Sequence, residues 1–135
     1  AGRWTLTRKI IQRNGDVFAF MGEAEFSWLE GSEHEESRAL AYFENGEVTA
    51  PNGHVMPAER RYFWQQLQTG LFEVLFDDKR YFHSFSATNP NAEHLCGDDN
   101  YVVRYDFSTW PVWRSTWKVI GPRKDYTMIS KYSPA

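Results

Sequence analysis

The chain has 135 residues, of which 41% are hydrophobic and 17% are aromatic, and its formal net charge is -3. A chain of this length suits one domain, residues 1–135, built around one core. Its mildly acidic charge offers no broad cationic field, and no stretch approaches the roughly 18 apolar residues of a membrane span, so we expect neither nucleic acid nor membrane as a partner.

The first predicted element is a β-hairpin. Residues from Trp4 to Gln12 alternate in the period-two pattern of a strand. The dipeptide Asn14-Gly15 follows and favours a tight type I′ turn, because both central residues of that turn need positive φ. Residues on one face of the next strand should point inward: Phe18, Phe20, Gly22, Ala24, Phe26 and Trp28. Because Gly22 and Ala24 are small where a closing sheet bends, they predict a barrel corner.

The next predicted strand runs from Glu33 to Glu44 and ends at a second turn dipeptide, Asn45-Gly46. Its opposite face, which includes Tyr42, is expected to be solvated. A short strand from Glu47 to Ala50 should follow the turn. The face expected to point inward carries Ser37, Ala39, Ala41 and Phe43.

The remainder of the chain continues as short strands. A loop is expected at Pro51 to Gly53. The segment Ala58 to Leu67 is compatible with a helix, but its aromatic content favours a strand. Three aromatic-rich period-two runs separated by turn residues fill Tyr101 to Tyr132. Additional short strands are expected at Leu71 to Phe76, Arg80 to Phe85 and Ala92 to Cys96.

Together these elements predict an all-β fold of roughly nine or ten antiparallel strands, with turns about every eight to twelve residues. We favour a single closed up-and-down β-barrel over a sandwich, because closure removes the exposed strand edges.

Two short motifs at opposite ends of the chain are shared with a known barrel superfamily. Gly2-Arg3-Trp4 resembles the Gly-X-Trp signature of the lipocalin and fatty-acid-binding-protein (calycin) superfamily, in which the Trp plugs the closed end of the barrel. Gly121 to Tyr126 is similar to the turn before the last strand of those proteins, although Lys124 stands where they have Thr. The resemblance implies a lipocalin-like barrel in which Arg123, Lys124 or Lys131 packs over Trp4.

The chain also resembles, over nearly its whole length, a family of small uncharacterised bacterial and fungal proteins. This resemblance implies the same lipocalin-like barrel and no particular reaction. The shared motifs are Arg80-Tyr81-Phe82-His83, His94-Leu95-Cys96, Tyr101-x-x-Arg104-Tyr105-Asp106-Phe107 and Gly121 to Tyr126.

Several polar side chains lie among the aromatic residues of the predicted strands. A His or Tyr among rings orients the one polar group of an apolar ligand, and an Arg inside a barrel would bind a carboxylate. An ion pair with Asp106 explains Arg104 equally well, and His83 also fits a hydrogen-bonded core residue. The candidate ligand-binding residues are His83, Tyr81, Arg60, Tyr62, Tyr101, Arg104 and Tyr105.

Metal, cofactor and covalent chemistry have little support. His83, His94 and Cys96 are zinc-binding residue types, but four closely spaced ligands are lacking, and no nucleotide-binding loop occurs. We therefore expect no cofactor and no metal. Because Cys96 is the single cysteine, an internal disulfide is excluded and a cytoplasmic location is expected. No Ser or Cys of the sequence lies in a Gly-rich elbow, so we do not expect covalent catalysis.

The sequence also predicts where three of the tryptophans lie. Trp113 and Trp117 should lie in the core, whereas Trp110, beside Pro111 at a turn, could close the rim of a pocket.

The leading hypothesis is a protein that binds a small, mostly apolar or aromatic molecule inside the barrel, rather than an enzyme. One alternative is a barrel isomerase, hydratase or hydrolase that uses His83 as acid or base. The others are a haem or metal site at His83 or His94 and a structural or interaction module. A homodimer is left open.

Overall fold

The computed structural model describes residues 2–29, 38–66, 71–78, 80–86, 91–96 and 99–135. The side chains of residues 38, 81 and 93–96 are not part of this description. Ten strands occupy the described residues: β1 (Gly2–Gln12), β2 (Val17–Trp28), β3 (Arg38–Thr49), β4 (Val55–Gln66), β5 (Leu71–Phe76), β6 (Tyr81–Ser86), β7 (Asn91–Cys96), β8 (Asp99–Asp106), β9 (Trp113–Ile120) and β10 (Asp125–Pro134).

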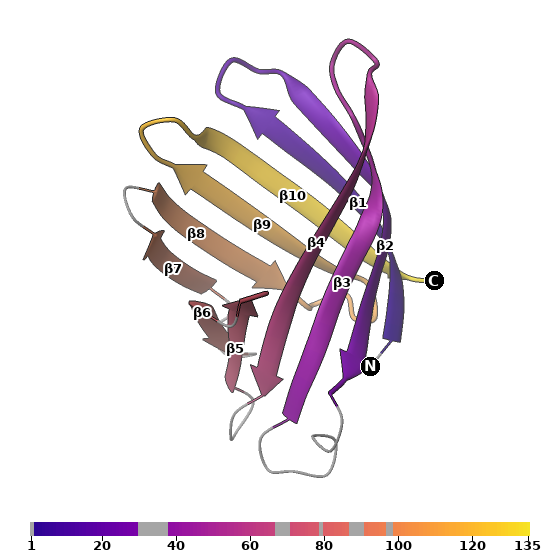
Figure 1. Ribbon diagram of the computed structural model, residues 1–135, viewed down its shortest axis with the longest axis vertical. Coiled ribbons are helices and arrows are strands. Elements are labelled where there is room, and N and C mark those ends of the chain that lie inside the picture. Colours follow the sequence, from indigo (N-terminus) through magenta and orange to yellow (C-terminus); the bar gives the residue numbers. More distant parts are fainter. Residues whose placement is uncertain (1, 30–37, 67–70, 79, 87–90, 97–98) are drawn as a thin grey trace.

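All ten strands belong to one antiparallel sheet that curls into a nearly closed barrel (Figure 1). Its order is β6-β5-β4-β3-β2-β1-β10-β9-β8-β7, so the first and last strands of the chain pair with each other. The sheet edges β6 and β7 face each other where the barrel closes. The predicted all-β, lipocalin-like barrel is confirmed. No helix among the described residues is long and apolar enough to cross a membrane.

The interior is filled by alternate side chains from every part of the sheet. Leu6, Ala24, Phe82, Val103 and Val119 are fully buried. Because successive side chains of a strand point to opposite faces, the predicted inward row of β2 does reach this core. The segment of Ala58 to Leu67 for which a helix was the alternative is a strand through Gln66, as its aromatic content predicts.

The predicted turn at Asn45-Gly46 is wrong, because β3 continues through this dipeptide to Thr49. Gly46 pairs with Gly22 of β2, and a Cβ on either glycine would collide with the backbone of the other strand. The two glycines therefore allow a close approach between strands. Gly22 lies in the inward row as predicted, but its partner is a glycine of the next strand rather than a side chain.

The expected orientation of β3 is also wrong. Its register with β2 places Tyr42 opposite the inward-facing Phe26 and Glu44 opposite the inward-facing Ala24. Tyr42 is consequently 3% exposed and Glu44 is 2% exposed. Phe43, which was expected inside, lies on the other face, with the guanidinium of Arg61 4.2 Å from its ring centre.

The first hairpin lies where the sequence predicts it, but its loop is longer than a type I′ turn. Gly15 N–H donates to Gln12 O at 2.9 Å, and Gln12 N–H donates to Asp16 O at 2.8 Å. Three residues, Arg13 to Gly15, therefore connect the paired ends, with Gly15 at a φ of 91°. The predicted loop at Pro51 to Gly53 is confirmed and also contains a positive-φ glycine, Gly53.

The superfamily resemblance implies that a basic residue packs over Trp4, and this prediction is wrong. Trp4 pairs with Pro134 at one end of β10, whereas Tyr126 pairs with Gln12 at the other end. Arg123 and Lys124 precede Tyr126 and so lie at the end of the barrel away from Trp4. Lys131 is exposed.

Candidate functional site

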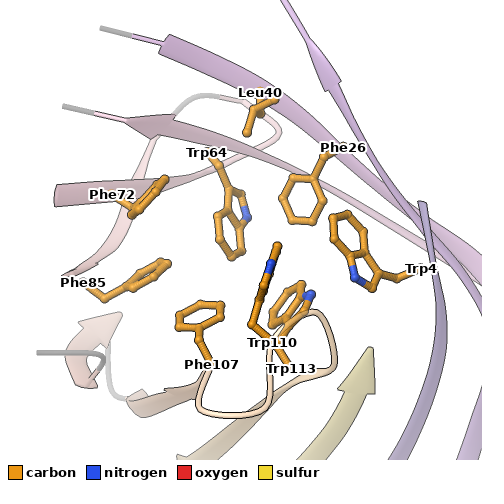
Figure 2. A pocket seen from close by; sticks show the side chains of 9 residues that line it. All are labelled: Trp4, Phe26, Leu40, Trp64, Phe72, Phe85, Phe107, Trp110 and Trp113. Atoms are coloured by element: carbon orange, nitrogen blue, oxygen red, sulfur yellow. The ribbon is translucent and has the colours of Figure 1, made fainter. Parts of the chain in front are cut away.

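An aromatic cavity opens at the end of the barrel where β1 begins (Figure 2). It has a volume of about 330 Å³. Eight of its nine lining residues are aromatic, and none is charged. They come from strands β1 to β6 and β9, together with the segment between β8 and β9: Trp4, Phe26, Leu40, Trp64, Phe72, Phe85, Phe107, Trp110 and Trp113.

Ring-to-ring contacts hold the wall of this cavity in place. Trp64 lies edge-on to Phe26, with ring centres 4.9 Å apart, and edge-on to Phe85 at 5.4 Å. Phe85 in turn stacks on Phe72 at 5.4 Å. Because these are preferred geometries for aromatic pairs, the rings support one another and keep the cavity preformed.

Trp110 forms the rim, as the sequence predicts for a Trp beside Pro111. Its side chain is 60% exposed, and its ring centre lies 6.0 Å from that of Trp4 and 6.3 Å from that of Phe107. Trp4 is fixed in turn, because its Nε1–H donates to Pro111 O at 3.2 Å. The exposed indole therefore lies at the boundary between the cavity and solvent.

A buried ion pair lies deeper in the barrel. Arg8 donates from Nη1 and Nη2 to the two carboxylate oxygens of Glu44 at 2.5 and 3.0 Å, and from Nε to Ser130 Oγ at 2.7 Å. The Tyr42 hydroxyl donates to Glu44 Oε1 at 2.7 Å and lies 2.8 Å from the Tyr132 hydroxyl. Such a bidentate, fully hydrogen-bonded pair is the arrangement in which buried charges are tolerated.

Burial governs the protonation of this layer. It raises the pKa of Tyr132 to about 12 and raises the pKa of Tyr42 well above its usual value. Burial alone would lower the pKa of Arg8, but Tyr132 and Glu44 outweigh it and raise that pKa. At neutral pH the two phenols are therefore protonated, and Arg8 is a cation whose charge Glu44 balances.

A much smaller polar cavity, of about 20 Å³, adjoins this ion pair. This volume is enough for about one water molecule. Trp64 lines both cavities, so its indole forms part of the wall between the aromatic space and the polar one.

Three of the predicted site residues, Arg60, Tyr62 and Tyr105, line the small polar cavity. His83 is 1% exposed and lines neither cavity; its Nε2 lies 2.9 Å from the Tyr105 hydroxyl. Its ring also packs edge-on against Phe82, with centres 4.3 Å apart. The structure therefore brings His83 and Tyr105 together inside the aromatic core.

The remaining predicted site residues are spread over the barrel. Tyr101 is partly buried at the far end, where its hydroxyl accepts a hydrogen bond from Lys124 Nζ at 3.4 Å. Arg104 is exposed, because it alternates with the buried Val103 and Tyr105. The side chain of Tyr81 lies outside the described part of β6. No predicted site residue with a described side chain lines the aromatic cavity, and ligand contact by all seven stays a prediction.

The sequence analysis did not single out Arg8 or Glu44. Arg8 follows Trp4 and Leu6 in the inward row of β1, and a cation on an apolar face was an available signal. The turn expected at Asn45-Gly46 made Glu44 the last residue of the predicted strand. The sequence analysis therefore did not place Glu44 in the middle of a strand, where the structure has it.

Metal binding gains no support from the described residues, among which no three His, Cys, Asp or Glu side chains are grouped as metal ligands. The side chains of His94 and Cys96 fall outside the description, so the haem or metal alternative there stays a prediction.

Comparisons with known proteins bear on the fold and the family. The S-type phycobiliprotein lyase CPES from Guillardia theta has a similar structure, with a TM-score of 0.72 over 100% of this chain and 88% of that chain. At 7% sequence identity, the likeness shows the fold alone. No curated protein matches the chain. A family model described as a family of unknown function (DUF6314) matches residues 1–134, and the chain therefore belongs to this family.

Proposed function

We propose that the barrel binds a small, mostly apolar molecule in the aromatic cavity. The observation that carries this proposal is the combination of a volume of about 330 Å³ with a lining of eight aromatic residues and one leucine. Small-molecule sites are usually preformed, largely apolar concavities of roughly 300–1,000 Å³. The cavity meets this description on size and on lining.

The shape of the lining favours a flat ligand. Trp64, Phe85 and Phe72 support one another through edge-on and stacked contacts, and Trp110 stands at the solvent boundary. An aromatic molecule entering this space could make the offset or edge-on contacts that rings prefer. Its apolar surface would leave water at a gain of about 25 cal/mol per Å² buried.

Acid–base catalysis by His83 is less well supported. A general acid or base has to come within hydrogen-bond reach of its substrate. His83 is packed among Phe82, Phe85 and Tyr105 and lines neither cavity. The Guillardia theta neighbour is named as a lyase, but at 7% identity its name transfers no catalytic residue to this chain.

Calorimetric titration with a panel of flat apolar molecules, together with tryptophan emission, tests the proposal. We expect saturable one-site binding. Trp110→Ala should weaken binding about five- to tenfold, since a lost aromatic contact amounts to roughly 1 kcal/mol. Because Trp110 is largely exposed, the thermal midpoint should hardly change.

Met21→Ala is the matched control, since Met21 is 68% exposed on the outer face of β2. This variant should bind as tightly as the unmodified protein. Absence of binding across the panel, or equal affinity of the Trp110 and Met21 variants, would contradict the proposal.

A further inference from the structure

We infer that the ligand of the aromatic cavity is uncharged, and that Glu44 enforces this selectivity by cancelling the charge of Arg8. The inference rests on the proposed binding function and specifies its ligand class. A guanidinium inside an apolar barrel would by itself attract a ligand carboxylate. In this protein a carboxylate of the chain itself already fills that position.

The hydrogen bonds of Arg8 leave little for a ligand to use. Both of its Nη atoms donate to Glu44, and its Nε donates to Ser130. The Glu44 carboxylate accepts a further bond from Tyr42, whose hydroxyl lies beside that of Tyr132. A second carboxylate brought to this layer would face a balanced ion pair and would lie next to the negative charge of Glu44.

The cavity wall also separates the ligand from the charged and hydroxyl groups of the buried layer. Tyr42 packs against Phe26, with ring centres 4.9 Å apart, and Tyr132 stacks on Trp113 at 3.7 Å. Phe26 and Trp113 line the aromatic cavity, whereas the two tyrosines do not. The tyrosine hydroxyls bind within the buried layer, so a charged group in the cavity would lose its water and meet no oppositely charged side chain in the lining.

Arg60 is the other cation that lines the small polar cavity. It does not line the aromatic one, and Trp64 belongs to the wall between the two. A ligand carboxylate in the aromatic cavity could reach Arg60 only by crossing that wall. Arg60 thus provides an internal check, because binding of an acid through Arg60 would contradict the inference.

A matched pair of ligands tests the inference directly. Naphthoate and its methyl ester share one flat ring system and differ in charge, and calorimetry measures both affinities at neutral pH. We expect the ester to bind about 100-fold more tightly, or more, since burying an unpaired carboxylate costs several kcal/mol. Lowering the pH until the acid is protonated should bring its affinity close to that of the ester, whose own affinity stays constant.

Equal or tighter binding of naphthoate would overturn the inference while leaving the binding function intact. If Arg60→Met abolished such binding, the carboxylate would be assigned to Arg60. If neither compound bound, the proposed function itself would fail for this ligand class, and the inference with it.

Variants of two glutamates on β3 test the role of Glu44. Glu44→Gln leaves the charge of Arg8 unbalanced behind the cavity wall, and the attraction of this charge through the low-dielectric interior is expected to increase naphthoate affinity at least about tenfold, with little effect on the ester. Glu47→Gln, at an exposed position of the same strand, should leave both affinities unchanged. If Glu44→Gln does not fold alone, both ligands should restore its folded spectrum, and the excess of naphthoate over ester that this needs should be about tenfold smaller than their affinity ratio in the unmodified protein. Unchanged naphthoate affinity, or an unchanged ratio between the two ligands in this rescue, would contradict the role of Glu44.

Discussion

The buried tyrosines couple the stability of the barrel to alkaline pH. Burial, the largest cause, raises the pKa of Tyr132 to about 12 and that of Tyr42 and Tyr105 well above the usual value of 10. A raised pKa means that the folded state favours the protonated phenol. The resulting contribution to stability is complete below pH 10 and is lost as the pH rises through about 12.

We therefore expect two classes of tyrosine in a spectrophotometric titration of the folded protein. The partly buried Tyr126, whose pKa burial raises less strongly, should ionise first, and the fully buried phenols only as the fold is lost. In denaturant all of them should ionise together near pH 10, and Tyr132→Phe should reduce the late class. A single transition near pH 10 in the folded protein would contradict this burial.

Strands β2 and β3 approach each other closely at their paired glycines. A Cβ at Gly46 would meet the carbonyl oxygen of Met21, and a Cβ at Gly22 would meet that of Asn45. Backbone atoms cannot move aside as a flexible side chain would, so the two strands would have to separate locally.

Gly46→Ala is expected to lower the free energy of unfolding by about 1–3 kcal/mol, the usual cost of overpacking. Chemical denaturation measures this change. An alanine at Gly2 is the control, because its Cβ would meet the ring of Trp4 at 3.2 Å, a contact that a shift of a few tenths of an ångström relieves. If the two variants were equally stable, the Gly22–Gly46 approach would not constrain the barrel.

The same two strands show where local sequence patterns succeed and fail. Alternation alone places Phe20 and Phe26 inside, because half of a strand must face the core. It fails at Asn45-Gly46, since a glycine that admits a neighbouring backbone has the same local signature as a glycine in a turn. The error moved the predicted end of the strand and hid Glu44, although the existence of a strand there was predictable.

The barrel as a whole shows why the fold was more predictable than the site. The curled sheet follows from many short amphipathic runs, and each run is visible in the sequence. The cavity instead depends on which rings meet across strands: Tyr132 stacks on Trp113 at 3.7 Å and is not part of the cavity lining, whereas Trp4 and Trp110 are. That distinction arises from register and curvature, so the sequence pointed to interleaved polar residues such as Tyr105, which line the smaller cavity.

The barrel has a seam where its two edge strands, β6 and β7, face each other. Within the described residues the sheet is continuous from β6 through the β1–β10 pair to β7, and no ladder joins β6 to β7. Among the described residues, each edge strand forms a ladder with one neighbouring strand, whereas β1 forms ladders with two from Trp4 to Ile11. Opening at the seam therefore separates two strands that no described ladder joins.

Amide hydrogen exchange followed by NMR measures this difference strand by strand. We expect the amides of β6 and β7 to exchange fastest among the strands, and those of β1 and β10 to approach the protection of global unfolding. Because Phe85 of β6 lines the aromatic cavity, a bound ligand should slow exchange in β6 more than in β10. Equal protection in β6, β7 and β1 would mean that the barrel opens only as a whole, and the seam would then have no separate mobility.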